Sequence, residues 1–345
     1  MPDLGWVTDP KVLGITRSLD PPGTLPHLAK RLDAESDPNE FEIELDVEML
    51  HIDATSFREL SVRGGGDRVR IAELIHEIVV ARGKLQNPST GSGGVLVGRV
   101  AGIGDRSLSR HLHVGDLVVP LVSLIAIPLR LDAVGPVELG RSQVPAQGRA
   151  ILTGRMPAAV VPADLPLRVA LTAFDVYPAA SYVRTYARTG DHVLVLGAGH
   201  AGLLAAAAAR ERVGASGQVS VVDVSDQALE SLAQVVPSAI GICADATSPL
   251  AVAGALERAG LPRADVTLLC ATVPGCEGAA ILSTADSGVV LFLSTAVSFS
   301  AAALGTDAVS SQARLVIPNG FTDDHGDYTI ELVRRIPALR ASFEA

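Results

Sequence analysis

The spacing of hydrophobic residues changes near residue 165. Before that point, residues 41–50 (FEIELDVEML) alternate apolar and acidic positions, which predicts a half-buried strand. Residues 91–104 (GSGGVLVGRVAGIG) predict a second strand, punctuated by glycines. A helical period runs over Arg68–Arg82, with Gly83 as its C-cap. Residues 1–40 have no sustained period. The first part of the chain is therefore predicted to be a β-rich domain preceded by an irregular arm.

After residue 165, short apolar runs alternate with alanine-rich helical stretches. The strands that we expect are His192–Leu196, Gln218–Val222, Ile240–Cys243, Val266–Cys270 and Val289–Leu293. Helices are expected at Ala201–Val213, at Asp226–Val236 and, interrupted by Pro337, at Thr329–Ala341. Alternation of strands with helices predicts a parallel, doubly wound sheet of the Rossmann type. The predicted fold is thus α/β, with domains at 1–165 and 166–310 and a segment, 311–345, that returns to the first domain.

Composition narrows the classes of partner. The 345 residues include 28 Lys and Arg against 38 Asp and Glu, a formal net charge of −10. This acidic balance argues against nucleic acid or an anionic membrane as the main partner. Only three cysteines occur (Cys243, Cys270 and Cys276), too few for a disulfide framework, and no apolar leader opens the chain. We therefore expect a cytoplasmic globular protein.

A glycine motif follows the first strand of the predicted parallel sheet. Gly197, Gly199 and Gly202 form the G-x-G-x-x-G pattern and open an alanine-rich helix. In this context the first glycine permits a tight turn, the second admits a pyrophosphate, and the third lets helix and strand pack closely. The loop residues Ala198, His200 and Ala201 are then expected to offer their backbone to the phosphates. The motif predicts a dinucleotide site.

An acidic residue ends the next predicted strand. Asp223, followed by Val224, is placed to accept hydrogen bonds from the ribose hydroxyls and to repel a 2′-phosphate. Neither Arg nor Lys follows in VVDVSDQ, so NAD is favoured over NADP. Further contacts are expected after the later strands, at Asp245, Ala271, Thr272, Val273, Ser294 and Thr295.

The order of the two domains resembles the medium-chain dehydrogenase/reductase superfamily, in which a GroES-like β-rich catalytic domain precedes the dinucleotide domain. The glycines of residues 93–104 and the pair Gly115-Asp116 match its motifs. The zinc-ligand positions of that superfamily fall on Ala54, on Gly94 and near Thr172. These side chains supply no thiolate, imidazole or carboxylate, so no metal site is expected. The same resemblance implies a cofactor contact by Asn319 and Gly320.

Several passages are similar to the L-erythro-3,5-diaminohexanoate dehydrogenases of lysine fermentation. They are DATSF (53–57), RGKLQNPSTGSGG (82–94), ATVPG (271–275), STAVSFSAAALG (294–305) and PNGF (318–321). The resemblance implies oxidation of the C3 amine of 3,5-diaminohexanoate to a ketone, 5-amino-3-oxohexanoate, with release of ammonia and reduction of a nicotinamide cofactor. Hydride transfer without metal suits this reaction, because the lone pair of the amine nitrogen stabilises the developing cation.

Candidate catalytic side chains each have a structural alternative. Ser56, in residues 53–57 at the expected end of a strand, is either a proton relay and substrate ligand or a strand-end hydroxyl bonded to the backbone. Asp175 either pairs with a substrate ammonium or is an acid at a helix start. Tyr177 either donates a hydrogen bond to the reacting groups or is a buried packing residue. Phe57 and two polar loop residues, Gln86 and Asn87, are further candidates for contact with substrate.

Two other functions remain open on the sequence. A zinc-independent quinone or enoyl reductase would use NADPH, which Asp223 opposes. A non-catalytic NAD(P) sensor on the same scaffold would bind the nucleotide without turnover. The expected partner is a small amino-acid substrate. A homodimer is also expected, because an edge strand of the dinucleotide sheet needs a partner.

Overall fold

The computed structural model describes residues 7–109, 111–137, 139, 142–294, 296–318, 320–322 and 324–344. Its contacts divide the chain into two compact units, Met1–Asp175 and Val176–Ala345. The division lies after the expected boundary at 165 because helix α3 (Leu167–Val176) is tied to the first unit. The side-chain amide of Gln143 donates to the carbonyl oxygen of Arg168 in α3, at 3.1 Å.

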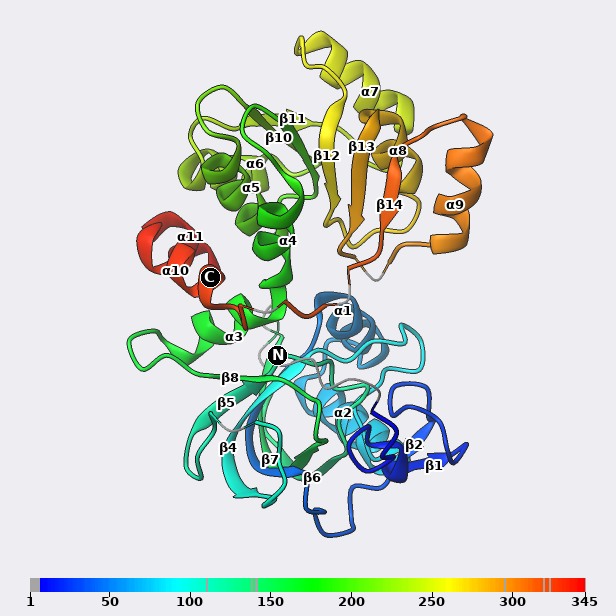
Figure 1. Cartoon of the computed structure of the whole chain (residues 1–345), viewed down its shortest axis with the longest axis vertical. Helices are drawn as coiled ribbons and strands as arrows, with labels where there is room; N and C mark the ends of the chain where they lie inside the picture. Colours follow the sequence, from blue (N-terminus) through cyan, green and yellow to red (C-terminus); the bar gives the residue numbers. More distant parts are fainter. Residues whose placement is uncertain are drawn as a thin grey trace. The chain divides into compact units, whose positions relative to one another are not determined.

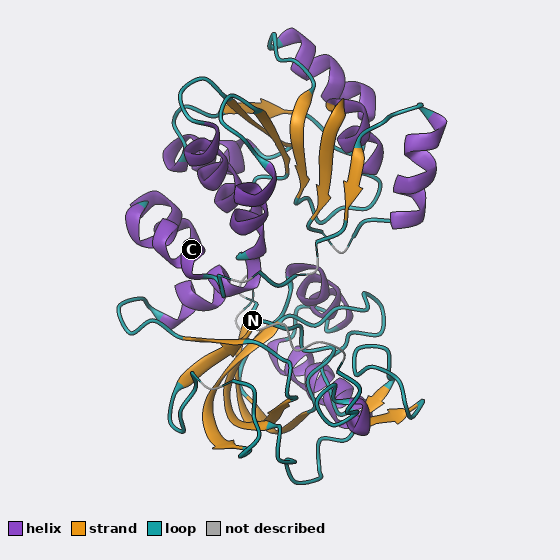
Figure 2. Ribbon diagram, in the orientation of Figure 1, coloured by secondary structure: helices purple, strands orange, loops and turns teal. Residues whose placement is uncertain are grey.

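The first unit contains an antiparallel sheet and helices that pack on it (Figures 1 and 2). Its elements are η1 (Ile15–Arg17), β1 (Ser18–Asp20), β2 (Arg31–Leu32), β3 (Ile43–His51), α1 (Ala54–Arg63), α2 (Arg68–Arg82), β4 (Val95–Ile103), β5 (Leu117–Pro120), β6 (Leu129–Val134), β7 (Gln143–Leu152), β8 (Ala158–Val160) and α3. The main sheet has the order β6-β7-β3-β4-β5-β8, whereas β1 and β2 pair separately within the arm. The arm is thus less irregular than expected.

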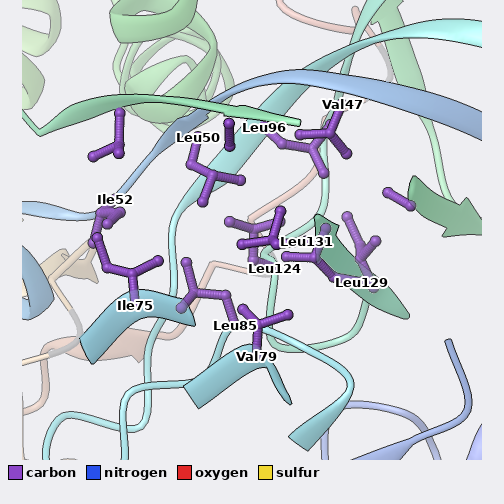
Figure 3. Close-up of a cluster of buried hydrophobic side chains, with 14 of the residues drawn as sticks. Val47, Leu50, Ile52, Ile75, Val79, Leu85, Leu96, Leu124, Leu129 and Leu131 are labelled. Carbon is purple, nitrogen blue, oxygen red and sulfur yellow. The ribbon is translucent and has the colours of Figure 1, made fainter. Parts of the chain in front are cut away.

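The core of the first unit lies between this sheet and helices α1 and α2. Figure 3 shows Ile75 and Val79 of α2 facing apolar side chains that include Leu50 and Leu96. The side chain of Asp67 caps the first turn of α2, and Gly83 ends the helix with φ +61°. This helix has the bounds that its period predicted. Helix α1 was not predicted, because residues 53–57 were interpreted as the end of a strand.

The second unit has six parallel strands with helices between them, as Figure 2 shows. Its elements are α4 (Pro178–Tyr186), β9 (His192–Leu196), α5 (His200–Val213), β10 (Gln218–Asp223), α6 (Asp226–Val235), β11 (Ile240–Cys243), α7 (Pro249–Arg258), β12 (Ala264–Leu269), α8 (Glu277–Ser283), β13 (Thr284–Phe292), α9 (Phe299–Ala308), β14 (Arg314–Val316), α10 (Asp327–Arg335) and α11 (Pro337–Glu344). The strand order is β11-β10-β9-β12-β13-β14. Strands β9 to β11 extend the sheet in one direction, and strands β12 to β14 extend it in the other. The topological switch point therefore lies between β9 and β12, and doubly wound sheets bind ligands at such a point.

The C-terminal segment contributes to the second unit. Strand β14 pairs in parallel with β13, aligning Leu315 with Val290. Helix α10 contacts α4 and α5, and α11 contacts α5 and α6. Residues 311–345 were expected to return to the first domain, but their apolar side chains Ile330, Leu332 and Leu339 are buried within the second unit. Among the described residues, no helix is long and apolar enough to cross a membrane.

Candidate functional site

The loop between β9 and α5 has the geometry that its glycines predict. Gly197 has φ +100°, and a Cβ there would lie 2.7 Å from the backbone nitrogen of Ala271. A Cβ on Gly202 would lie 1.8 Å from the carbonyl oxygen of Gly197. By contrast, a Cβ on Gly199 would meet nothing within 4 Å. The first and third glycines are therefore required by packing within the protein, whereas the second borders open space.

The open space lies at the start of α5. Gly199 is the N-cap of this helix and provides no side-chain hydrogen bond to its first turn. Helix N-termini bind anionic groups through backbone N–H groups and the helix dipole. Ala198 is buried in the loop, and His200, Ala201 and Gly202 form the first turn. These residues fit the pyrophosphate of a dinucleotide.

Asp223 joins this loop to the end of β10. Its Oδ2 accepts a hydrogen bond from the backbone nitrogen of Ala198 (2.7 Å), and its Oδ1 accepts one from Ser225 (2.9 Å). A carboxylate has further lone pairs, which remain suited to ribose hydroxyls. Val224 follows with its side chain exposed, and residues 224–228 (VSDQA) contain no cation. The arrangement suits an unphosphorylated ribose.

The loops after the other parallel strands begin at the same edge of the sheet as the glycine loop. The backbone nitrogen of Ala271 donates to the carbonyl oxygen of Leu196, so the loop after β12 lies against the glycine loop. Thr272 in this loop is half-buried, whereas Val273 is exposed. After β13, the buried Ser294 accepts a hydrogen bond from Ala296. Thr295 and Asn319 lie outside the described residues.

Two predicted cofactor contacts have side chains that are engaged elsewhere. The Asp245 carboxylate accepts hydrogen bonds from the backbone and the hydroxyl of Thr247, and these bonds lower its pKa. The imidazole of His200 packs edge-on against Phe343 of α11 and lies 3.1 Å from the carbonyl oxygen of Ser342. Only the backbone of His200 is thus placed for a phosphate, and its side chain ties α5 to α11.

Polar side chains also gather in the first unit, where β3 ends and β7 begins. His51 and Gln143 are partners in the strand register. The amide nitrogen of Gln143 donates to Nδ1 of His51 at 3.2 Å and to the carbonyl oxygen of Arg168 at 3.1 Å. Nε2 of His51 lies 3.7 Å from Oδ2 of Asp175. We call His51, Asp53, Gln143 and Asp175 the β3–β7 cluster.

His51 is neutral in this cluster. Burial lowers its pKa to about 4, although the nearby carboxylate of Asp53 acts in the opposite direction. The contact with Asp175 favours the protonated form of His51. The cost of removing that positive charge from water is larger, so the ring remains neutral. Because Nδ1 accepts the hydrogen bond from Gln143, the proton of the neutral ring is on Nε2 and faces Asp175.

Two acceptor atoms of the cluster have no partner among the described residues. Oδ1 of Asp53 caps α1 by accepting from the backbone nitrogen of Ser56 (2.9 Å), but its Oδ2 is buried without a hydrogen bond. Oε1 of Gln143 is likewise buried and unbonded. An unmade hydrogen bond on a buried acceptor costs about 1–3 kcal/mol. Such atoms indicate a ligand or water that brings N–H or O–H donors.

Asp175 lies near the C-terminal end of α3, three residues before Pro178, where α4 begins. A carboxylate near a helix C-terminus is unfavourable with the helix dipole, whereas one just before a helix N-terminus is favourable. The alternative that Asp175 is an acid at a helix start therefore remains, with α4 as the helix. Its contact with His51 also places Asp175 in the β3–β7 cluster.

The expected zinc-ligand positions hold no ligand. Ala54 begins α1 with its side chain exposed, and Thr172 donates its hydroxyl to the carbonyl oxygen of Arg168. Gly94 has φ +102°, and a Cβ there would lie 2.0 Å from the carbonyl oxygen of His51. A side chain at position 94 is thus incompatible with this backbone. No group of His, Cys, Asp and Glu suited to a metal ion occurs among the described residues.

Ser56 is fully buried in a triangle of hydroxyl groups. Its Oγ lies 2.6 Å from Oγ1 of Thr90 and 2.9 Å from Oγ of Ser92, and those two atoms are 3.0 Å apart. Neither Thr90 nor Ser92 was singled out from the sequence. Three hydroxyls in a ring can each donate once and accept once, so the triangle both holds the loop of residues 86–94 and permits proton exchange.

The other predicted substrate contacts have structural partners. Phe57 belongs to the hydrophobic core of the first unit. Asn87 is buried and donates to Oε2 of Glu59 at 2.7 Å. Gln86 accepts from Arg82 and donates to the carbonyl oxygen of Gly91, each at 3.3 Å. These bonds shape the loop that carries Thr90 and Ser92.

Tyr177 is buried in the second unit, with its hydroxyl bonded to the backbone. The hydroxyl donates to the carbonyl oxygen of Gly320 and accepts from the nitrogen of Thr322, each at 3.2 Å. Burial raises its pKa above the ordinary value of the phenol. Tyr177 thus fixes the 320–322 segment, in agreement with the packing alternative.

Solved structures share this arrangement of folds. A quinone oxidoreductase from Pseudomonas syringae matches with a TM-score of 0.56 at 15% identity, covering 90% of this chain and 89% of that one. A mycobacterial protein solved as an NADPH complex matches with a TM-score of 0.57 at 17% identity, covering 89% of each chain. An alcohol dehydrogenase from Thermus sp. ATN1 has a TM-score of 0.53 at 18% identity, covering 90% and 87%. This chain therefore shares the fold of these solved oxidoreductases.

Sequence relatives identify the protein family to which the chain belongs. A family model described as the L-erythro-3,5-diaminohexanoate dehydrogenase N-terminal domain matches residues 16–162. The L-erythro-3,5-diaminohexanoate dehydrogenase of Fusobacterium nucleatum is 38% identical over 333 residues, which is 96% of each protein. That of Acetoanaerobium sticklandii is 34% identical over 334 residues, covering 96% of this chain and 97% of the relative. The chain belongs to the L-erythro-3,5-diaminohexanoate dehydrogenase family, an oxidoreductase family, as its sequence motifs predicted.

Proposed function

We propose that this protein catalyses the oxidative deamination of L-erythro-3,5-diaminohexanoate, with NAD as the oxidant. The products are 5-amino-3-oxohexanoate, ammonia, NADH and a proton, and one water is consumed. The observation that carries the proposal is the identity with two relatives of that name over nearly the whole chain.

Asp223 supports NAD as the cofactor. Both of its oxygens are fixed by backbone N–H groups of the glycine loop and of Ser225, so the carboxylate cannot easily turn away from the ribose. A 2′-phosphate would meet this negative charge, and residues 224–228 supply no cation to offset it. When bound, the nicotinamide supplies the hydride acceptor.

Hydride departure from C3 requires a neutral amine at that carbon. The ring of hydroxyls at Ser56, Thr90 and Ser92 is the group that we assign to carry the released proton away. The nitrogen lone pair stabilises the positive charge that forms on C3, so no Lewis acid is needed. Ala54 and Gly94, which stand at the expected ligand positions, agree with a metal-free reaction.

The test is turnover of the purified full-length chain with L-erythro-3,5-diaminohexanoate and either NAD or NADP. We expect the kcat/KM for NAD to be at least about tenfold higher than that for NADP. The repulsion between Asp223 and the 2′-phosphate accounts for this ratio if it costs about 1.4 kcal/mol or more. Activity should survive a zinc chelator. Asp223→Ala should lower this preference while retaining the fold. Absence of turnover with both cofactors, in protein that binds NAD, would contradict the proposal.

A further inference from the structure

We propose that the β3–β7 cluster is the subsite that binds the protonated, non-reacting amine of the substrate. The inference rests on the proposed function, because it assigns one group of that substrate to named side chains. It makes Asp53 and Gln143 specificity-determining residues, with His51 holding the amide of Gln143 in place.

The hydrogen-bonding chemistry of the cluster suits an ammonium. Oδ2 of Asp53 and Oε1 of Gln143 are both buried acceptors without a partner among the described residues. The orientation of the Gln143 amide is fixed, because its nitrogen must donate both to His51 and to the carbonyl oxygen of Arg168. Its oxygen therefore remains an acceptor. A group that satisfies these atoms has several N–H donors, as an ammonium does.

The charge of the cluster also favours a cation. Asp53 carries a carboxylate whose Oδ2 is buried without a partner among the described residues, and the neutral ring of His51 beside it adds no positive charge. The low pKa of His51 keeps it neutral over the physiological range. A half-buried site with this excess of negative charge favours a cationic ligand over an anionic or neutral one. The carboxylate of an amino-acid substrate would be repelled from the same place.

The two amines of the substrate differ in the protonation state that the reaction requires. Carboxylates beside an amine stabilise its protonated form and raise its pKa. The amine on C3 has to lose a proton before hydride departs, so such surroundings would oppose the reaction there. The amine on C5 keeps its proton throughout. The cluster therefore suits the C5 ammonium.

The experiment compares two substrates, 3,5-diaminohexanoate and 3-aminohexanoate, which lacks the C5 amine. The variant is Asp53→Asn, which retains Oδ1 as the cap of α1 and removes the charge. The matched control is Asp67→Asn, since Asp67 caps α2 in the same way but is exposed. Both kcat and KM are measured for both substrates, and binding is measured by calorimetry without turnover.

Asp53→Asn should lower kcat/KM for the diamine by about 30-fold, mainly through KM, and by less than about threefold for the monoamine. Asp67→Asn should leave kcat/KM unchanged for both substrates. In calorimetry, the wild type should bind the diamine about 30-fold more tightly than the monoamine, and Asp53→Asn should remove that difference. The calorimetric comparison of the two amines in the wild type needs no variant to fold.

Equal losses for both substrates, or equal affinities of the wild type for the two amines, would overturn the subsite. Failure of the proposed function gives a different result, because the wild type would then oxidise neither amine. Turnover of the diamine by the wild type, with equal effects of Asp53→Asn on both substrates, would remove only the subsite.

Discussion

The glycine loop of the second unit is formed by backbone atoms, whereas the β3–β7 cluster of the first unit is formed by side chains. At the loop, backbone approaches backbone: the Cβ positions of Gly197 and Gly202 are filled by neighbouring main-chain atoms. At the cluster, side chains from β3, β7, α3 and the start of α1 meet, and two of their oxygen atoms remain unbonded among the described residues.

This difference decides how each site tolerates change. A site made by the backbone fails when any side chain is added at its crowded positions. A site made by side chains depends on charge and hydrogen bonding, and isosteric substitutions can alter its specificity without altering the fold.

Gly202→Ala should abolish dinucleotide binding and destabilise the protein. Its Cβ would lie 1.8 Å from the carbonyl oxygen of Gly197, so α5 must shift. We expect a loss of about 3 kcal/mol in the free energy of unfolding and at least about 100-fold in affinity for NAD. Urea unfolding and calorimetric titration of NAD measure the two effects.

Gly199→Ala is the matched control, because its Cβ meets nothing within 4 Å. We expect a stability change within about 0.5 kcal/mol, together with at least about tenfold weaker NAD binding. Undiminished NAD affinity in this variant would contradict the placement of the pyrophosphate beside Gly199.

These two positions also show why the sequence predicted the loop so well. Glycines at this fixed spacing after an apolar strand are typical of one kind of turn, and the residues that form the turn are all adjacent in the chain. The bounds of α2 and β9 were predictable for a similar reason, since a clear period and a C-cap or flanking turn lie within one short segment. The C-terminal segment was not predictable, because the pairing of β14 with β13 is set by packing rather than by a local pattern.

The β3–β7 cluster was missed because its members are far apart in the sequence. His51 and Gln143 are 92 positions apart and become neighbours only through strand register. The available signal was weak, because His51 follows the strand predicted at residues 41–50 but no strand was predicted near Gln143. Asp175 was a candidate from the sequence because of its place in the chain. Its position near the end of α3 could not be predicted, because it depends on where that helix starts.

The stability of the protein should fall as the pH is lowered from about 6.5 towards 4. The pKa of His51 is about 4 in the folded state against an ordinary value of 6.5, so in this window the unfolded chain binds a proton that the folded chain excludes. The total effect is about 3 kcal/mol, complete below pH 4. His51→Asn should remove this part of the pH dependence. An unchanged profile in urea unfolding at about pH 7 and pH 5 would contradict a neutral, buried His51.

Tyr177→Phe should cost stability and leave catalysis intact. The change leaves the carbonyl oxygen of Gly320 and the nitrogen of Thr322 without their hydroxyl partner, which costs about 1–2 kcal/mol. We expect kcat to stay within about threefold of the wild type. A much larger fall in kcat, in a variant that retains its fold and NAD affinity, would restore Tyr177 as a catalytic donor.

Ser56→Ala should cost only about 1 kcal/mol of stability, because Thr90 and Ser92 still bond to each other. If the hydroxyl triangle carries the substrate proton, kcat should fall about tenfold or more, with a changed pH profile. A variant with wild-type kcat would limit Ser56 to holding the loop.

The most direct test of the account is to measure NADH and ammonia together during turnover of L-erythro-3,5-diaminohexanoate by the wild-type protein. Oxidative deamination predicts that ammonia and NADH form in equal amounts, with 5-amino-3-oxohexanoate as the carbon product. NADH without ammonia, or ammonia without NADH, would contradict the account.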